Sequence, residues 1–561
     1  MAAFKEFIPK SYECLKNYTL SLFKKDLLAG ITVGIIALPL AMAFAIASGV
    51  GPERGLYTAV IAGFLISALG GSRVQIGGPT GAFVVLVYDI VQRSGYNGLC
   101  VATLIGAVLL LLMGVFRLGS WIKYVPHPLI TGFTSGIALI IFSSQIKDFF
   151  GLQMGTPPAG FIEKWIAYFE ACCAFEPMTL AIGAGTLAII LLIRRYAPWL
   201  PWGIASIVLA TCAAYFLHLP VPTVFSRFGE IPHTLPVPSL PSFSISLQTF
   251  QDTFMDGIAI AFLGGIESLL SAVIADGMTG HRHRSNIELI GQGIANIGVV
   301  LFGGIPATGA IARTAANIKT GAQTPVAGMI HAVVLFLILF CFSPLVSKVP
   351  LAALAAVLIM VAWNMSEAHH FVRLLKAPAG DRAILLTGFL LTVFVDITAA
   401  IMLGMILASF LFMKRMSEAA KTVSLTQVFQ ENGTEERDPD AIFRKVIPPG
   451  VEVYEIQGPF FFGAADMLKE LTQGTEKVPK VCILRMRAVP LIDASGMHAL
   501  KEFHDRCKKQ NTHLLLSGVH GQTAKDLKHF GFEKAIGKDS IFPHIDAALA
   551  HAAKLIEKEK P

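Results

Sequence analysis

Two charged residues lie inside stretches of sequence that otherwise resemble membrane spans. Glu267 is near the middle of "IAIAFLGGIESLLSAVIADG" (258–277), and Arg313 lies in "ATGAIARTAAN". A charge at the centre of a bilayer costs at least about 2.5 kcal/mol, so such residues usually pair with one another or face a cavity. Burial favours the protonated form of a carboxylic acid, and an arginine supplies a positive field. The two residues therefore predict a proton-coupled anion site, a structural ion pair between two helices, or both.

Two short segments interrupted by glycine occupy matching places in the sequence. "LGGSRVQIGGPTGAFVVLVYDIV" begins at Leu69 and "LFGGIPATGAIARTAANIKTG" at Leu301. Paired segments of this kind indicate an inverted-repeat transporter. A helix that begins inside the membrane leaves backbone N–H groups unpartnered and carries about half a positive charge at that end, so two facing N-termini form an anion site. Glycines that merely pack helices are the alternative.

The side chains around these helix starts are the candidate site residues. Thr80 and Thr308 are placed to cap a helix or to donate to a ligand. Ser271 follows Glu267 by one turn and would line the same wall. Small residues allow a ligand to approach the backbone; these are Gly77, Gly78, Gly81 and Gly309.

Other polar residues in apolar segments have simpler explanations. Glu288, Gln292 and Asn296 share one helical face at a spacing of four, which predicts a hydrogen-bonded helix contact. His331 is expected to be a core histidine with its hydrogen bonds satisfied. The cluster "GHRHR" (280–284) falls in a short loop, where an excess of cytoplasmic positive charge explains it.

The composition indicates a large membrane domain followed by a small soluble one. The chain has 561 residues, of which 54% are hydrophobic and 15% charged, with a mean hydropathy of +0.63. We predict a cytoplasmic segment (1–26), a transport domain (27–415) with repeats at about 27–218 and 254–414, a linker (416–445) and a terminal domain (446–561). About fourteen apolar segments fill the two repeats, at 27–48, 55–70, 79–93, 97–116, 129–147, 178–194, 199–218, 254–276, 285–302, 307–319, 326–346, 350–365, 381–394 and 396–414.

The distribution of basic residues predicts the topology. Lysine and arginine gather in the loops on the side of Lys24 and Lys25, which places both termini in the cytoplasm of a multi-pass protein of the inner (plasma) membrane. The net charge of +7 is explained by this bias and requires no nucleic-acid partner. The N-terminus does not resemble a cleaved signal peptide. Few basic residues fall on the outer face: Arg54, Lys164, Arg227 and Lys348.

The C-terminal part alternates strand and helix patterns and predicts a small α/β domain. "VEVYEIQGPFFFGAADMLKEL", "VCILRMRAVPLIDASGMHALKEFHDRC", "THLLLSGV" and "GQTAKDLKHFG" supply the alternating elements. The sequence shows neither a phosphate-binding loop nor the spacing of a catalytic triad, and its cysteines lack zinc spacing. We therefore expect no enzyme activity, no metal and no cofactor.

Together these features resemble the sulfate permease (SulP) family of anion transporters, over nearly the whole chain. The resemblance rests on "DLLAGITVGIIALPLAMAFAIASG", "GGPTGAF", "GIESLLSAVIADGMTG" and "GGIPATGAIARTAANIKTGAQTP". The tail is similar to a STAS domain through "LIDASGMHAL". The resemblance implies a uracil-permease-like fold of 14 spans as 7+7 inverted repeats, in which spans 1–4 and 8–11 move against the others. It also implies a homodimer and a cytosolic protein partner for the tail.

Family membership also implies where the substrate binds. The small anionic substrate would sit between the half-helices, touched by spans 1 and 8. The tail would carry a phosphorylation site at Ser495, near Asp493. The implied substrate-binding residues are Phe44, Pro79, Thr80, Gly81, Glu267, Ser271, Thr308, Gly309 and Arg313.

The substrate expectation rests on the first span. Sulfate-carrying members of the family tend to have Pro-Gln-Gly where this chain has Pro39-Leu40-Ala41. The chain is more similar to the bacterial C4-dicarboxylate carriers of the family, through "GITVGIIALPLAMA", "VAWNMSEAH" and "AIARTAAN". We expect uptake of succinate, fumarate or aspartate by alternating access, with H⁺ as the coupling ion through Glu267. The alternative is bicarbonate or sulfate transport, with Na⁺ coupling as in family members that carry Asp in span 8. An anion channel or a membrane sensor would be a different class of protein.

Overall fold

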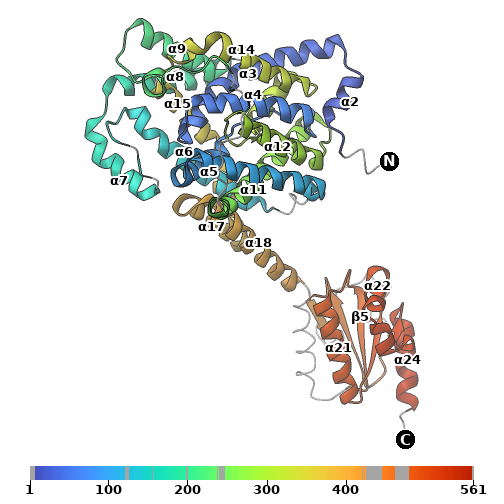
Figure 1. Ribbon diagram of the computed structural model, residues 1–561. Helices are drawn as coiled ribbons and strands as arrows, with labels where there is room; N and C mark the ends of the chain where they lie inside the picture. The colour runs from blue at the N-terminus through green and yellow to red at the C-terminus, as the bar shows by residue number, and fades with distance from the viewer. Residues whose placement is uncertain are drawn as a thin grey trace. The chain divides into compact units, whose positions relative to one another are not determined.

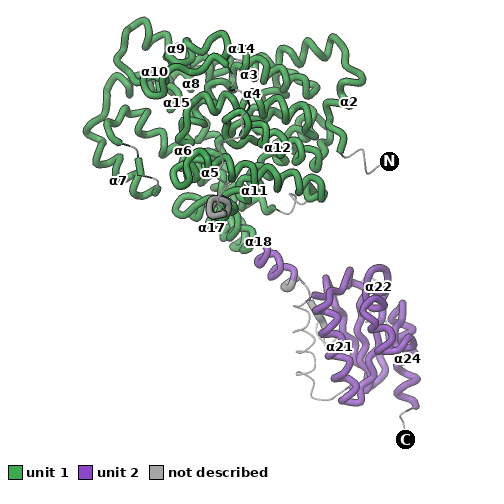
Figure 2. Tube along the Cα trace, viewed as in Figure 1, with its two compact units in different colours: residues 1–408 green, residues 409–561 purple. Residues whose placement is uncertain are grey.

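Apolar helices build most of the chain. The computed structural model describes residues 7–120, 125–155, 157–158, 160–197, 200–234, 236, 238, 247–419, 421–424, 445–461 and 479–558. These residues form two compact units, 1–408 and 409–561 (Figure 2). Eight helices in the described part are long and apolar enough to cross a membrane. The remaining helices that overlap predicted apolar segments do not meet this criterion of length and hydropathy.

Each of the fourteen predicted apolar segments overlaps a helix, although the segment 307–319 becomes helical only from Ile311. The segments 79–93 and 97–116 are joined in one helix that is broken at Gly95, where φ is 66° and ψ −175°, a conformation that glycine adopts without a steric penalty. The helices are α3 (Leu20–Ala47), α4 (Pro52–Leu69), α5 (Gly81–Val115), α6 (His127–Phe150), α8 (Pro177–Tyr196), α9 (Trp202–Phe216), α11 (Leu247–Thr279), α12 (Ser285–Leu301), α13 (Ile311–Lys319), α14 (Val326–Val346), α15 (Leu351–Met365), α17 (Ala379–Phe394) and α18 (Ile397–Ala419).

The helices pack in two groups. In the first group α5 contacts α11 and α12, while α14 contacts α3 and α4 (Figure 1). In the second group α6 contacts α15 and α17, and α8 contacts α9 and α15. This division agrees with the predicted grouping of spans 1–4 and 8–11 against the remaining spans. Short helices complete the unit: α2 (Lys10–Lys16), α7 (Phe161–Ala171), η2 (Cys172–Ala174), α10 (Val224–Phe228) and α16 (Ala368–Leu374).

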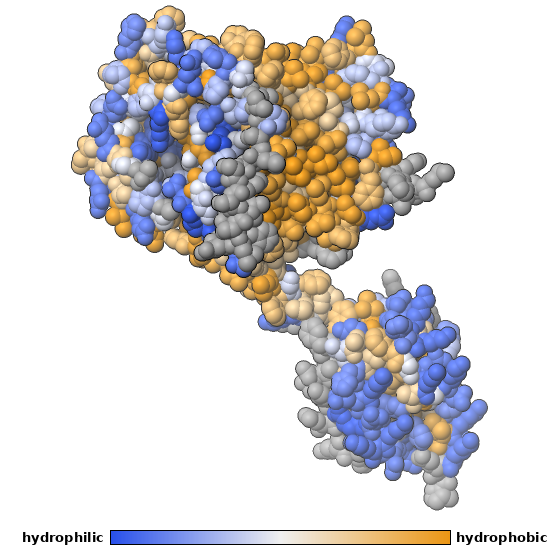
Figure 3. Space-filling model, in the orientation of Figure 1, coloured by the Kyte–Doolittle hydropathy of each residue, from blue (hydrophilic) through white to orange (hydrophobic). Residues whose placement is uncertain are grey.

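The surface of the first unit suits contact with lipid. The face shown in Figure 3 carries a broad hydrophobic area. A water-soluble protein seldom exposes an apolar surface of this extent. Large apolar side chains are exposed on several helices of this unit, among them Leu191, Leu192 and Phe340.

The second unit contains a five-stranded sheet with helices on both faces. The strand order is β3-β4-β5-β6-β7, with β3 antiparallel to β4 and the other neighbours parallel. One face is buried mainly by α21 and the other by α24. The elements are β3 (Lys421–Ser424), β4 (Val451–Gln457), β5 (Val481–Ala488), α21 (Ala494–Lys509), β6 (His513–Ser517), α22 (Gly521–His529), α23 (Phe532–Ile536), η4 (Lys538–Ser540), β7 (Ile541–Phe542) and α24 (Ile545–Lys558).

The predicted order of strands and helices in the tail is confirmed for β4, β5, α21, β6 and α22. The helix predicted directly after β4 lies outside the described residues. Most of the predicted linker, 425–444, lies outside them as well.

Candidate anion-binding site

Two short strands bring the predicted half-helices together. β1 (Gly77–Gly78) pairs antiparallel with β2 (Thr308–Gly309), so that Gly77 lies opposite Gly309 and Gly78 opposite Thr308. The backbone N–H of Ala310 donates to the carbonyl of Ile76 (2.8 Å) and extends this pairing. Directly after the strands, α5 begins at Gly81 and α13 at Ile311. Two helix N-termini therefore begin next to one another inside the apolar unit, as the paired motifs predicted.

Arg313 connects the two half-helices. It lies in the first turn of α13 and is 3% exposed. Its Nη2 donates to the carbonyl of Pro79, which precedes α5. Its Nη1 is buried and has no hydrogen-bond partner among the described residues. One edge of the guanidinium thus holds the start of α5, and the other edge remains available to a ligand.

Gly78 provides the space that Arg313 occupies. Its φ is +144°, which side chains rarely adopt, and a Cβ at this position would lie 2.6 Å from Nη1 of Arg313. Any larger residue would therefore displace the guanidinium.

The two threonines of the paired motifs differ. The hydroxyl of Thr308 donates to the carbonyl of Gly264 in α11 (2.7 Å). Thr80 occupies the N-cap position of α5, but its side chain makes no capping hydrogen bond, and its buried Oγ1 has no partner in the described part of the chain. Thr308 therefore holds β2 against α11, whereas Thr80 keeps a donor for a ligand.

Glu267 lies on α11 and is 7% exposed. Neither a hydrogen bond nor an ion pair joins it to another described residue, and in particular it does not pair with Arg313. The structural ion pair that the sequence left open is therefore wrong. An acid that is buried without a partner is better suited to binding a proton than to fastening helices.

Ser271 has a structural contact. Its hydroxyl donates to Oγ1 of Thr314 in α13 (3.1 Å), and the same oxygen accepts the backbone N–H of Ile76 (3.0 Å). Ser271 thus supports the strand crossing from α11. Its predicted role in lining the site is not needed to explain its position.

The remaining predicted residues lie around the crossing. A Cβ on Gly81 would meet Sδ of Met365 at 2.7 Å and Cδ1 of Ile141 at 3.4 Å, so helices of the second group touch the start of α5. Gly309 lies against the side chain of Gln75. Phe44 is buried in α3 and is 5% exposed.

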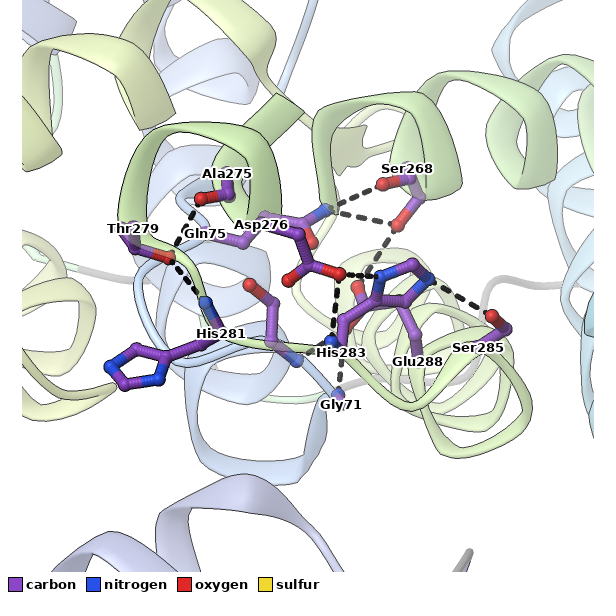
Figure 4. Close-up of polar contacts among 11 residues, drawn as sticks. Gly71, Gln75, Ser268, Ala275, Asp276, Thr279, His281, His283, Ser285 and Glu288 are labelled. Atoms are coloured by element: carbon purple, nitrogen blue, oxygen red, sulfur yellow. Dashed lines mark hydrogen bonds and ion pairs between the residues drawn. The ribbon is translucent and has the colours of Figure 1, made fainter. Parts of the chain in front are cut away.

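A hydrogen-bonded network behind the crossing was not foreseen as a unit. Nε2 of Gln75 donates to the hydroxyl (3.0 Å) and the carbonyl (3.2 Å) of Ser268, and this hydroxyl donates to Oε1 of Glu288 (2.9 Å) (Figure 4). The other oxygen of Glu288 accepts the backbone N–H groups of Gly71 (2.7 Å) and Ser72 (3.2 Å). A residue next to Glu267 is thereby fixed to the segment that leads into β1. The only sequence signal was the position of Gln75, two residues before Gly77.

The polar face of α12 is confirmed as a helix contact. Nε2 of Gln292 donates to Glu288 (2.9 Å), and Nδ2 of Asn296 donates to the carbonyls of Gln292 and Ala307 (both 2.9 Å). The N–H of Ala307 donates back to Asn296 (2.8 Å). These bonds hold the segment that leads into β2.

His331 corrects a sequence prediction. It is completely buried in α14, as expected, but neither ring nitrogen has a hydrogen-bond partner within the described ranges. The ring packs against Gly63 of α4, where an added Cβ would lie 3.2 Å from it. The expectation of a satisfied histidine is therefore wrong.

The "GHRHR" loop is structural. Nδ1 of His283 lies 2.7 Å from Asp276 Oδ2, and Nε2 lies 2.9 Å from the hydroxyl of Ser285 (Figure 4). Arg284 binds the carbonyl of Ile8 and the carboxylate of Glu13. No group of three potential metal ligands occurs among the residues that the structure describes.

In the second unit, Ser495 is exposed in the first turn of α21. Asp493 is the N-cap of this helix and accepts the backbone N–H of Gly496 (2.7 Å). The predicted phosphorylation site is therefore accessible at a helix N-terminus.

Half-helices that begin face to face inside an apolar helical body define a membrane transporter. The chain belongs to the sulfate permease family, whose profile matches residues 23–388, and a STAS domain matches residues 443–548. It is therefore an anion transporter with a C-terminal STAS domain.

Relatives of known sequence cover almost the whole chain. YvdB of Bacillus subtilis (strain 168), a candidate sulfate transporter, is 42% identical over 95% of this chain and 98% of its own length. The bicarbonate transporter BicA of Picosynechococcus (strain PCC 7002) is 30% identical over 94% of each chain.

Solved structures show the same fold. The transmembrane domain of a cyanobacterial bicarbonate transporter BicA matches with a TM-score of 0.62 and 31% identity, over 68% of this chain and 98% of that domain. Murine Slc26a9, described as an anion transporter, matches with a TM-score of 0.86 over 99% of this chain and 95% of its own. Because Slc26a9 is only 18% identical, it supports the fold alone.

Proposed function

We propose that this protein takes up C4-dicarboxylates such as succinate, fumarate and aspartate, coupled to protons, by alternating access. The main supporting observation concerns Arg313, whose Nη1 is buried at the paired helix N-termini and has no hydrogen-bond partner among the residues described. A carboxylate there would accept charge-assisted hydrogen bonds, which are about twice as strong as neutral ones. The hydroxyl of Thr80 would add a further donor.

Glu267 is the proposed coupling residue. It is buried and unpaired within the described residues, on the helix that holds Thr308. In its ionised form it would repel an anion bound nearby. Uptake of a proton from the outside removes this repulsion, so substrate and proton enter together. The site lies at the boundary of the two helix groups, since Gly81 is next to Met365 and Ile141 of the second group. Movement of one group relative to the other would therefore expose the site to each side of the membrane in turn.

The remaining features follow the family resemblance. The protein works as a homodimer in the inner (plasma) membrane with both termini in the cytoplasm. The STAS domain binds a cytosolic protein, and phosphorylation of Ser495 would place negative charge at the N-terminus of α21, where the helix dipole favours it.

Bicarbonate or sulfate is the second candidate substrate. It is favoured by the 30% identity to the bicarbonate transporter BicA and by the 42% identity to YvdB. The substitution of Leu40-Ala41 for the Gln-Gly of sulfate-carrying members argues for the dicarboxylate.

A competition panel in proteoliposomes tests the substrate. We expect labelled succinate to accumulate under an inward proton gradient, and unlabelled fumarate to compete while sulfate and bicarbonate compete poorly. Uptake of labelled bicarbonate or sulfate, with no movement of succinate, would establish the second candidate instead.

A further inference from the structure

A cavity of about 200 Å³ lies between the two helix groups. From the first group it is lined by the C-terminal end of α3 and by residues 84–89 of α5, which precede the break at Gly95. From the second group it is lined by α6, α7 and the α17–α18 junction, together with Arg227 of α10. The distribution of basic residues predicts that these helix ends face the outside of the cell. The cavity is therefore a vestibule on the outer side of the protein.

Lys164 of α7 lines this vestibule as a buried cation to which the described residues supply no counter-ion. It is 6% exposed, and no described residue forms a hydrogen bond or ion pair with its Nζ. The ammonium lies 5.6 Å from the ring centroid of Tyr88, a contact with an aromatic face. Burial lowers the pKa of Lys164. An unpaired buried charge is costly, and an anion in the cavity would remove that cost.

Tyr168 lies one turn after Lys164 and supplies a second donor. It is 4% exposed, lines the same cavity, and its buried hydroxyl has no hydrogen-bond partner among the described residues. Burial raises the pKa of Tyr168, so the phenol keeps its proton. One helix face thus presents an ammonium and an O–H donor to one cavity, and neither has a hydrogen-bond partner in the part of the chain that the structure describes.

The acids of the vestibule are already engaged. Asp89 binds Arg93 (2.7 Å) and Asp148 binds Arg227 (2.9 Å). Asp396 accepts the backbone N–H of Ala399 (2.7 Å) at the start of α18. The other lysine of the cavity, Lys147, donates to the carbonyl of Gly155 (2.8 Å). None of these carboxylates is placed to neutralise Lys164.

The vestibule leads towards the half-helix site. Ile141 lines its wall, and the same side chain lies 3.4 Å from a Cβ placed on Gly81, the first residue of α5. Ile141 therefore contacts both the vestibule and the start of the first half-helix.

We propose that Lys164 and Tyr168 form an outer binding site for the oxyanion group of the transported substrate, occupied before the substrate reaches Arg313. The inference rests on the proposed transport function but not on the choice of substrate. A carboxylate, bicarbonate or sulfate offers the same chemistry here, because each presents negatively charged oxygen atoms to an ammonium and a hydroxyl donor.

The test is influx into right-side-out membrane vesicles that contain the full chain, with labelled succinate, bicarbonate and sulfate as separate probes. For the anion that the wild type transports, Lys164→Met should raise the external KM about ten-fold, the equivalent of one lost charge-assisted hydrogen bond, without changing the maximal rate. Tyr168→Phe should raise the KM less. Lys164→Arg should restore most of the affinity.

Lys348→Met is the matched control, because it removes one exposed outer lysine that lies over Tyr215 and not in the vestibule. It should leave the KM unchanged. An unchanged KM in Lys164→Met would overturn the proposal, as would a lower maximal rate at constant KM, which would indicate a structural role. Failure of succinate to enter, while another anion does, would contradict only the dicarboxylate function.

Discussion

The two half-helices are alike in backbone and different in side chains. Both follow a two-residue strand, and the strands pair with each other across the repeats. The first half-helix begins at Gly81 after Thr80, whose hydroxyl has no partner among the described residues, and this start carries no charge. The second has its threonine, Thr308, engaged with α11 and carries Arg313. In the proposed site, the repeated backbone would supply the two helix N-termini, and the unequal side chains would divide ligand binding from support.

Among the variants of the two half-helices, loss of Arg313 should reduce anion binding most. Arg313→Ala removes the only charge carried by either half-helix start and should weaken anion binding by about one hundred-fold, since hydrogen bonds to charged groups contribute about 1.5–3 kcal/mol each. Equilibrium binding of the transported anion to the purified protein measures this. Arg313→Lys, which keeps the charge but cannot bridge Pro79 and a ligand in the same way, should retain part of the affinity. Full affinity in Arg313→Ala would show that the helix N-termini suffice.

Gly78→Ala should have the next largest effect. The added methyl group meets the guanidinium of Arg313 at a φ that side chains rarely adopt, so we expect a loss of about 1–3 kcal/mol in stability and a parallel loss of binding. Thermal unfolding in detergent and anion binding are the measurements. Gly185→Ala in α8 is the control, because its Cβ would meet no atom within 4 Å. Equal melting temperatures for the two variants would contradict the role given to Gly78.

Substitutions of the two threonines should affect different properties, anion affinity for Thr80 and thermal stability for Thr308. Thr80→Val should weaken anion binding several-fold and leave thermal stability unchanged, because its hydroxyl has no protein partner within the described residues. Thr308→Val should lower stability by about 1 kcal/mol, the typical contribution of one hydrogen bond, and change affinity little. If both variants behave alike in both assays, the division of tasks between the half-helices is wrong.

The sequence was informative where periodicity or a local motif carried the signal. The fourteen apolar segments, the paired half-helix starts and the polar face of α12 all follow from spacing along one segment. The strand and helix order of the tail follows from the same kind of pattern.

Contacts between distant segments could not be predicted in the same way. The sequence suggested a pair between Glu267 and Arg313 because both are charged and apolar surroundings favour pairing, but the guanidinium binds the carbonyl of Pro79 instead. The unsatisfied state of His331 depends on its neighbours in other helices. From the sequence, Lys164 is only one of several basic residues on the outer face. Its position in the cavity beside Tyr88 depends on the fold.

The central claim is that Glu267 carries the coupling proton. Glu267→Gln imitates the protonated acid and removes the proton site, so binding and downhill exchange of the substrate should persist while accumulation against a gradient is lost. The decisive measurement is uptake into proteoliposomes with and without an inward proton gradient, in wild type and Glu267→Gln. The account predicts gradient-driven accumulation in the wild type only. Undiminished gradient-driven accumulation in Glu267→Gln would contradict it.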